Sequence, residues 1–260
     1  MGFLSKLFEK KVCAICGGEI GLFGNRKLED GNMCKNCAAK LSEWFSDRRS
    51  STVEEIKEQL AYREENRKAV ENFRTTRVLG DDTKVMLDED AGKFMVTDAS
   101  ARNLMEANPD VLTFAQVTGC EMDVEEDSDE EKREDKDGNW VSYAPPRYRH
   151  SYDFYMTIRV NHPWFDEMHF KLNRSSVETT GGTAVSAAHK PNPKLNQDYM
   201  EYQRMGDEIK NILTNAREQA REEAKAAAAP KMKVVCPWCG ATTMPDDTGC
   251  CEYCGGAMKG

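Results

Sequence analysis

The sequence of 260 residues contains no apolar run approaching the ~18–20 residues of a membrane-spanning helix, and this absence excludes an integral membrane protein. Positive charge is also scarce, because 36 lysines and arginines face 45 aspartates and glutamates, a formal net charge of −9. A protein that coats nucleic acid without sequence preference is therefore not expected. The patterns HExxH, GxSxG and GxxxxGK are absent too. We therefore expect a protein that is neither membrane-embedded nor an enzyme.

A secretory signal is missing as well. The start, MGFLSKLFEKK, has no long apolar core followed by small residues, and Ser5 and Lys6 do not fit the myristoylation pattern. We therefore expect a cytoplasmic protein. Residues 3–8 bring two phenylalanines and two leucines toward one helical face, so weak contact of the amphipathic segment 1–12 with a membrane surface is an alternative. Packing of this short segment on its own protein is favoured.

Eight of the ten cysteines form four CxxC pairs, two near each end of the sequence. Seventeen residues separate the pairs of the first set, eleven separate those of the second, and glycine directly follows three of the four pairs. In a reducing cytoplasm this spacing is typical of structural tetrahedral zinc sites, where each tight turn supplies two thiolates. Four thiolates fill every ligand position, so such sites stabilise a fold and leave no open position for catalysis. We predict two Zn²⁺ ions per chain, with these ligands: Cys13, Cys16, Cys34, Cys37, Cys236, Cys239, Cys251 and Cys254.

Some alternatives stay open for the cysteines. The pair Cys236-Pro-Trp-Cys239 alone would suit a thioredoxin-like redox site, but the βαβ context of such a site is missing. Iron could replace zinc, because the thiolate count does not distinguish the two metals. Cys250 could replace Cys251, although only Cys251 has CxxC spacing to Cys254. Cys120 stands alone after an apolar run, and we expect a buried structural cysteine there.

The two zinc ribbons are predicted at residues 13–45 and 231–260. A connecting helix is predicted over 51–76, because Ser51 and Glu54 have the spacing of a capping box. The apolar stripe of this helix is interrupted at 64–68, and we expect that stretch to be solvated.

A mostly antiparallel β domain is predicted over 77–190. Residues 84–97 have the pattern of a hairpin, and apolar residues alternate cleanly over 151–160. Helical periodicity over 192–229 then predicts a long helix that covers the sheet. The expected fold class is α+β, and the order of elements is similar to the pleckstrin-homology-like superfold, an analogy that establishes no function.

Most of the acidity lies in one segment, residues 121–137, where eleven acidic and three basic residues contribute −8. We interpret this segment as an acidic loop or hairpin tip in solvent, with Asp137-Gly138 as a turn. Its functional alternative is docking onto a basic partner. The histidines lie in or beside the β domain without metal-ligand spacing: His150, His162, His169 and His189.

The segment from Cys13 to Cys37 carries Lys27-Leu28-Glu29-Asp30-Gly31 before its second CxxC pair, and Leu41-Ser42-Glu43-Trp44-Phe45 follows. It resembles a bacterial zinc-ribbon domain family of unknown function, over roughly residues 1–75. The resemblance implies a metal-binding module at the first four cysteines and no known activity.

The function expected from these patterns is a zinc-binding, non-enzymatic adaptor that contacts a protein partner. The main alternative is a nucleic-acid-binding or regulatory protein, because residues 1–50 carry nine basic and six acidic residues. The basic residues available for phosphate contact are Arg26, Lys27, Lys35, Lys40, Arg48 and Arg49. A membrane-surface adaptor acting through residues 3–8 is the third possibility.

Overall fold

The computed structural model describes residues 11–228, 233–246 and 248–258. The chain divides into two compact units, Met1–Arg217 and Glu218–Gly260, and each is described by itself. The α+β class is confirmed, with several antiparallel sheets and a long helix late in the chain. The predicted segment 1–12 lies outside the described residues except for its last two. No helix in the described part of the chain combines the length and apolarity needed to cross a membrane.

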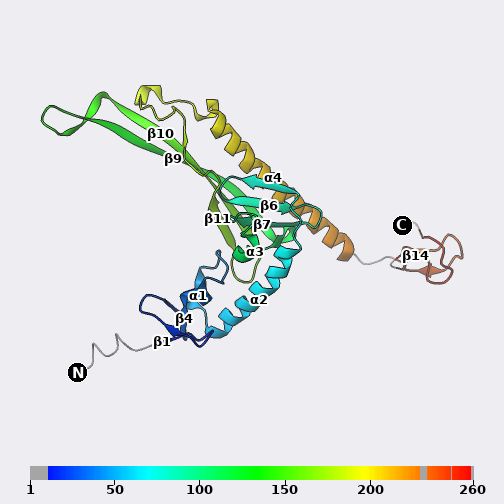
Figure 1. The fold of residues 1–260 in the computed structure, drawn as a ribbon. Helices are drawn as coiled ribbons and strands as arrows, with labels where there is room; N and C mark the ends of the chain where they lie inside the picture. Colours follow the sequence, from blue (N-terminus) through cyan, green and yellow to red (C-terminus); the bar gives the residue numbers. More distant parts are fainter. Residues whose placement is uncertain (1–10, 229–232, 247, 259–260) are drawn as a thin grey trace. The chain divides into compact units, whose positions relative to one another are not determined.

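The N-terminal module is built from short elements around one small core (Figure 1). Strand β1 pairs with β2, and β3 pairs with β4. Leu28, Met33 and Ile56 have no exposed surface, and Ile56 comes from the connecting helix α2. The beginning of α2 is therefore part of the core of this module. The elements are β1 (Lys11–Val12), β2 (Glu19–Ile20), β3 (Asn25–Lys27), β4 (Asn32–Cys34), α1 (Lys35–Ala38) and η2 (Asp47–Ser50).

Helix α2 (Val53–Glu71) opens with a capping box, but one residue later than predicted. Thr52 Oγ1 accepts from the Glu55 N–H at 3.3 Å, and Glu55 Oε2 accepts from the Thr52 N–H at 2.7 Å. Ser51 is not the cap because its hydroxyl donates to the carbonyl of Asp47 in η2, at 2.9 Å. The helix also ends before the predicted residue 76, since that residue, Thr76, donates its N–H to the Leu87 carbonyl at the sheet.

The β domain consists of two antiparallel sheets. The first has the strand order β5-β6-β7-β8, and the predicted hairpin over 84–97 is its central pair. Strand β5 was not predicted. In the second sheet β10 pairs with β9, β11, β12 and β13. The elements up to β8 are β5 (Arg77–Gly80), β6 (Lys84–Asp88), β7 (Lys93–Thr97), α3 (Leu104–Ala107) and β8 (Leu112–Thr113). The second sheet follows η3 (Phe114–Gln116) and contains β9 (Val117–Glu134), β10 (Trp140–Val160), β11 (Glu167–Lys171), β12 (Val177–Glu178) and β13 (Val185–Ser186).

Of the two interpretations of residues 121–137, the loop is wrong, because most of these residues belong to the 18-residue strand β9. The hairpin agrees with the structure, because β9 and β10 form one whose tip lies between Glu134 and Trp140. Strand β9 pairs with β10 along nearly its whole length, from Val117 opposite Val160 to Glu134 opposite Trp140 (Figure 1). Acidic residues are poor strand formers, but here the partner strand supplies the ladder and several cations, and tertiary pairing overrides propensity. The predicted turn at Asp137-Gly138 is confirmed, and Gly138 has φ +84°.

The long helix α4 (Gln197–Ala228) packs on the sheets with its first half, as its periodicity predicts. Tyr199, Ile209 and Leu213 join the main core. A Cβ at Gly206 would lie 2.1 Å from the sulfur of Met122 on β9, so glycine permits this close helix–sheet approach. The helix starts later than residue 192 because η5 (Pro193–Leu195) precedes it, and η4 (Ala187–His189) lies in the loop before that. Two sheets followed by a covering helix agree with the expected order of elements.

Candidate metal centres

The first centre joins two turns of the N-terminal module. The sulfur atoms of Cys13, Cys16, Cys34 and Cys37 all lie within 4.8 Å of one another. The Sγ atoms of Cys16 and Cys34 are 3.8 Å apart. A tetrahedral ion with metal–sulfur bonds of about 2.3 Å needs sulfurs about 3.8 Å apart. The arrangement is therefore compatible with a bound metal ion.

The backbone around these sulfurs explains why the chain folds this way locally. The Cys13 carbonyl accepts from the Gly17 N–H at 2.9 Å, and Gly17 has φ +72°, which allows the tight reversal after the first CxxC pair. The second pair begins helix α1, where Cys34 Sγ caps the helix by accepting from the Cys37 N–H at 3.4 Å. Backbone N–H groups aimed at sulfur orient the ligands and stabilise their charged form.

The four thiols have unequal tendencies to ionise. Burial opposes ionisation of Cys13, but hydrogen bonds from the backbone N–H groups of Cys16, Cys34 and Ile15 outweigh it and lower the pKa to about 6. Burial, followed by the neighbouring sulfurs, raises the pKa of Cys37. The first thiolate therefore forms readily and the last one does not, unless a cation offsets the accumulated charge.

The second centre lies in the C-terminal module, where β14 (Val234–Val235) pairs with β15 (Thr242–Thr243). The sulfurs of Cys236, Cys239, Cys251 and Cys254 lie within 4.8 Å of one another. The Cys236–Cys254 and Cys239–Cys251 sulfurs are 3.6 and 3.7 Å apart. Cys250 does not join this group, because its thiol points to the Thr248 carbonyl, 3.9 Å away. The geometry therefore favours Cys251 over Cys250, as the CxxC spacing predicts.

Both CxxC turns of the C-terminal module have the same construction. The Gly240 N–H donates to the Cys236 carbonyl at 2.9 Å, and the Gly255 N–H donates to the Cys251 carbonyl at 2.7 Å. Both glycines have positive φ, +74° and +71°. The glycines that follow these cysteine pairs in the sequence thus have a local conformational reason.

Ionisation in the second centre is again uneven. Burial opposes ionisation of Cys236, but the N–H groups of Cys239 and Trp238 lower its pKa to about 7. The Gly256 backbone favours the charged form of Cys254, yet the surrounding sulfurs raise its pKa to about 12. Both cysteine groups therefore need a cation before four thiolates can coexist.

Aromatic side chains stand on the surface of the C-terminal module. Trp238 and Tyr253 occupy the third position of the two CxxC turns, and they are 74% and 72% exposed. Trp238 is held in place, because its Nε1 donates to the Ala257 carbonyl at 3.2 Å and its ring lies against Gly256. A Cβ at Gly256 would come within 2.5 Å of that ring. Large exposed rings with a fixed orientation are typical anchors of protein interfaces.

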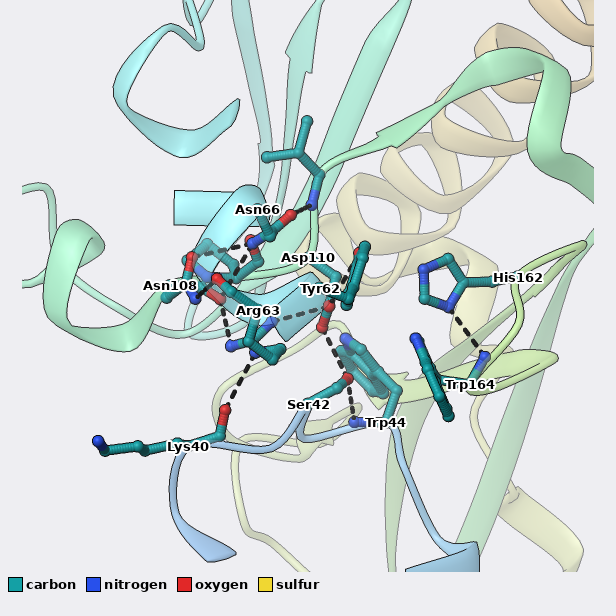
Figure 2. Close-up of polar contacts among 12 residues, drawn as sticks. Lys40, Ser42, Trp44, Tyr62, Arg63, Asn66, Asn108, Asp110, His162 and Trp164 are labelled. Carbon is teal, nitrogen blue, oxygen red and sulfur yellow. Dashed lines mark hydrogen bonds and ion pairs between the residues drawn. The ribbon is translucent and has the colours of Figure 1, made fainter. Parts of the chain in front are cut away.

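A buried polar cluster, which the sequence did not reveal, connects the N-terminal module to the β domain (Figure 2). Arg63 Nη1 donates to Asp110 Oδ1 at 2.7 Å, and both side chains are almost fully buried. Ser42 Oγ donates to the other oxygen of Asp110, also at 2.7 Å. Arg63 also reaches the Lys40 and Asn108 carbonyls. The stretch 64–68 was predicted to be solvated, but Asn66 within it is buried and bonds to Asn108 and Pro109.

Aromatic packing accompanies this cluster. Trp44 and Phe45 of the N-terminal module lie 6.4 Å from Phe170 and Trp164 of the β domain, measured between ring centroids. The segment after the first metal centre is thus anchored on the sheet. Contacts of this kind join residues more than 100 positions apart, and no local pattern predicts them.

The structure also places the other residues that the sequence analysis singled out, namely the basic residues, Cys120 and the histidines. Arg26, Lys27, Arg48 and Arg49 line one open hollow of the N-terminal module, whereas Lys35 and Lys40 lie outside it. Burial raises the pKa of Cys120 to about 12, in agreement with a structural thiol. The histidines have separate partners, among them Glu126 for His150 and Ser186 for His189. Among the described residues, only the two cysteine groups bring three or more metal-ligand atoms together.

The fold and the cysteine groups define an α+β protein with a group of four cysteines that could hold a metal ion near each end of the chain. A family model described as "Domain of unknown function (DUF4428)" matches residues 11–59. The match covers the first four cysteines and confirms the resemblance to a family of unknown function, over a shorter span than residues 1–75. No curated protein and no solved structure matches the chain.

Proposed function

We propose that this protein is a zinc-binding, non-enzymatic adaptor of the cytoplasm, in which two structural Zn²⁺ ions hold small modules in shape for contact with a protein partner. The observation that carries the proposal is the pair of four-cysteine groups with sulfurs 3.6–3.8 Å apart. Four thiolates satisfy a tetrahedral ion completely, so no position is left for a water or substrate. A metal in these sites would stabilise the fold and would not activate a reactant.

Zinc is favoured over iron because isolated paired CxxC turns of this type are the usual structural sites for Zn²⁺, which has no redox chemistry. The C-terminal module supplies the best candidate surface for the partner. Its two exposed rings, Trp238 and Tyr253, stand on the turns that carry the ligands, so an ion in the site would fix the positions of both.

The proposal is tested by quantitative capture of partners from the native host with the zinc-loaded full chain. We compare the wild-type chain with the double variant W238A/Y253A and with the control L195A/M200A, which removes exposed apolar side chains from the region of α4. A partner of the proposed kind is enriched at least tenfold by the wild type and the control but not by W238A/Y253A, and it rebinds when both proteins are purified. Equal capture by all three chains would show that these rings form no interface.

A further inference from the structure

The hollow on the N-terminal module is formed by two elements that are distant in sequence. Strand β3 contributes Arg26 and Lys27, and the short helix η2 contributes Arg48 and Arg49. Arg48 Nη1 donates to the Lys27 carbonyl at 2.5 Å, which fixes η2 against the strand. The four cations therefore line one open concave surface.

These cations form no ion pair within the described part of the chain. Glu29 also lines the hollow, but no carboxylate among the described residues forms an ion pair with Arg26, Lys27, Arg48 or Arg49. Burial, followed by repulsion from Arg49 and Arg26, lowers the pKa of Arg48. Crowded cations that form no ion pair attract an anion, and guanidinium groups bind phosphate through two parallel hydrogen bonds.

An exposed aromatic residue lies beside the hollow. Phe23, in the turn before β3, is 94% exposed, and its neighbour Leu22 is 80% exposed. Arg26 Nη1 donates to the Phe23 carbonyl at 3.4 Å, so this guanidinium lies next to the turn. A cationic groove next to an exposed ring is typical of proteins that bind single strands, because the backbone follows the cations while a base stacks on the ring.

We propose that this hollow binds the phosphate backbone of single-stranded nucleic acid, with Phe23 as the stacking surface for a base. A membrane surface is a poorer match, since it interacts with the charge of a whole face, and residues 11–59 carry eight basic and eight acidic residues. A single strand needs only the hollow and its neighbouring turn. The site is separate from the aromatic surface of the C-terminal module, so it adds a second ligand to the adaptor.

The test is fluorescence anisotropy of labelled 12-nucleotide single strands with the zinc-loaded full chain at several salt concentrations. The variant R26E/R49E reverses two charges in the hollow, and the control K35E/K40E makes the same charge change on exposed lysines of the same module outside it. We expect R26E/R49E to weaken binding at least tenfold and K35E/K40E to change it less than threefold. The slope of log K against log salt should become less steep by about 1.4 in R26E/R49E, at about 0.7 per lost phosphate contact.

A third variant, F23A, examines the stacking surface. It should weaken binding of single strands about fivefold or more and leave the weaker binding of duplex DNA unchanged. Metal content must equal that of the wild type in every variant. No binding by the wild type in 50 mM salt, equal loss in R26E/R49E and K35E/K40E, or an unaffected F23A would each overturn the proposal. Sedimentation with vesicles of phosphatidylserine and phosphatidylcholine, without any nucleic-acid binding, would overturn it in favour of a lipid surface.

Discussion

At the scale of single residues, the ion pair between Arg63 of α2 and Asp110 is buried, whereas the ion pairs between residues of α2 itself are exposed. Asp110 accepts from Arg63, Ser42 and Tyr62, and the two charged side chains are 7% and 1% exposed. A buried charge is tolerated only when it is paired and hydrogen-bonded, because desolvation is costly. The cluster therefore defines where the N-terminal module meets the β domain.

Replacing Asp110 with alanine should destabilise the protein by about 3–5 kcal/mol, because Arg63 would remain buried without its partner. Urea denaturation followed by tryptophan fluorescence measures this loss, since Trp44 and Trp164 lie beside the cluster (Figure 2). The control is Glu65→Ala, which removes an exposed ion pair with Lys68 of similar length, 3.0 Å, and should leave the midpoint almost unchanged. A loss for Asp110→Ala as small as the loss for the control would mean that the cluster does not hold the junction together.

The cysteine groups and this ion pair differ in how far the sequence reveals them. Each CxxC pair is a local pattern with a fixed geometry, so the sequence predicts all eight ligands and the choice of Cys251 over Cys250. Arg63 and Asp110 are 47 positions apart, and either residue alone has the pattern of an ordinary surface charge. Their burial depends on packing between elements, which a pattern within one element cannot report.

At the scale of elements, strand β9 shows where local propensity fails. Its last eleven residues contain seven acids, and composition alone favours a solvated loop. Ion pairs with neighbouring residues stabilise the strand instead. Glu131 bonds to Arg149 at 3.0 Å, and Glu121 bonds to Arg159 at 2.8 Å. Glu126 also forms an ion pair, with Lys190. The clean apolar alternation of 151–160, in contrast, is a property of β10 itself and could be predicted.

The acidic side chains of β9 also have a role at its free edge. β9 pairs with β10 on one side, and no other described strand pairs with it. Asp123, Glu125 and Asp129 are exposed and lie on the face opposite the core. A row of like charges prevents two such edges from joining into a continuous sheet. We therefore interpret the row as protection of this edge against self-association.

Removing that charge should allow chains to associate through β9. The variant D123N/E125Q/D129N should form dimers or larger species at concentrations at least tenfold lower than the wild type, as measured by size exclusion with light scattering. The control E54Q/E58Q/E65Q makes the same change in net charge on exposed positions of α2 and should behave like the wild type. Identical behaviour of both variants would assign any effect to total charge and not to the strand edge.

At the scale of the whole molecule, the three cores differ in what holds them together. Among the described residues, the main core contains 21 buried residues from the β domain and α4, and none of them is a predicted metal ligand. The N-terminal core adds Leu28, Met33 and Ile56 to its cysteines. In the described part of the C-terminal module the core consists of Cys236, Cys251 and Met258, so two of these three buried residues are predicted ligands. A module this small cannot bury enough apolar surface to fold without such an ion.

This difference predicts an ordered response to metal removal. On titration with a chelator at neutral pH, the C-terminal module should lose its structure first, the N-terminal module second, and the β domain should remain folded. Acidification should also release the ions, because protons compete with the ion for sulfurs such as that of Cys254, whose pKa without an ion is about 12. The affinity for the metal ion therefore falls as the pH falls, and both ions should be released before the β domain unfolds.

Metal analysis should find two zinc ions per wild-type chain and in Cys250→Ser, but one in Cys251→Ser. Hydrogen exchange resolved by segment assigns each loss to its module, and simultaneous exchange of all three cores would show that the ions stabilise the chain as a single cooperative unit.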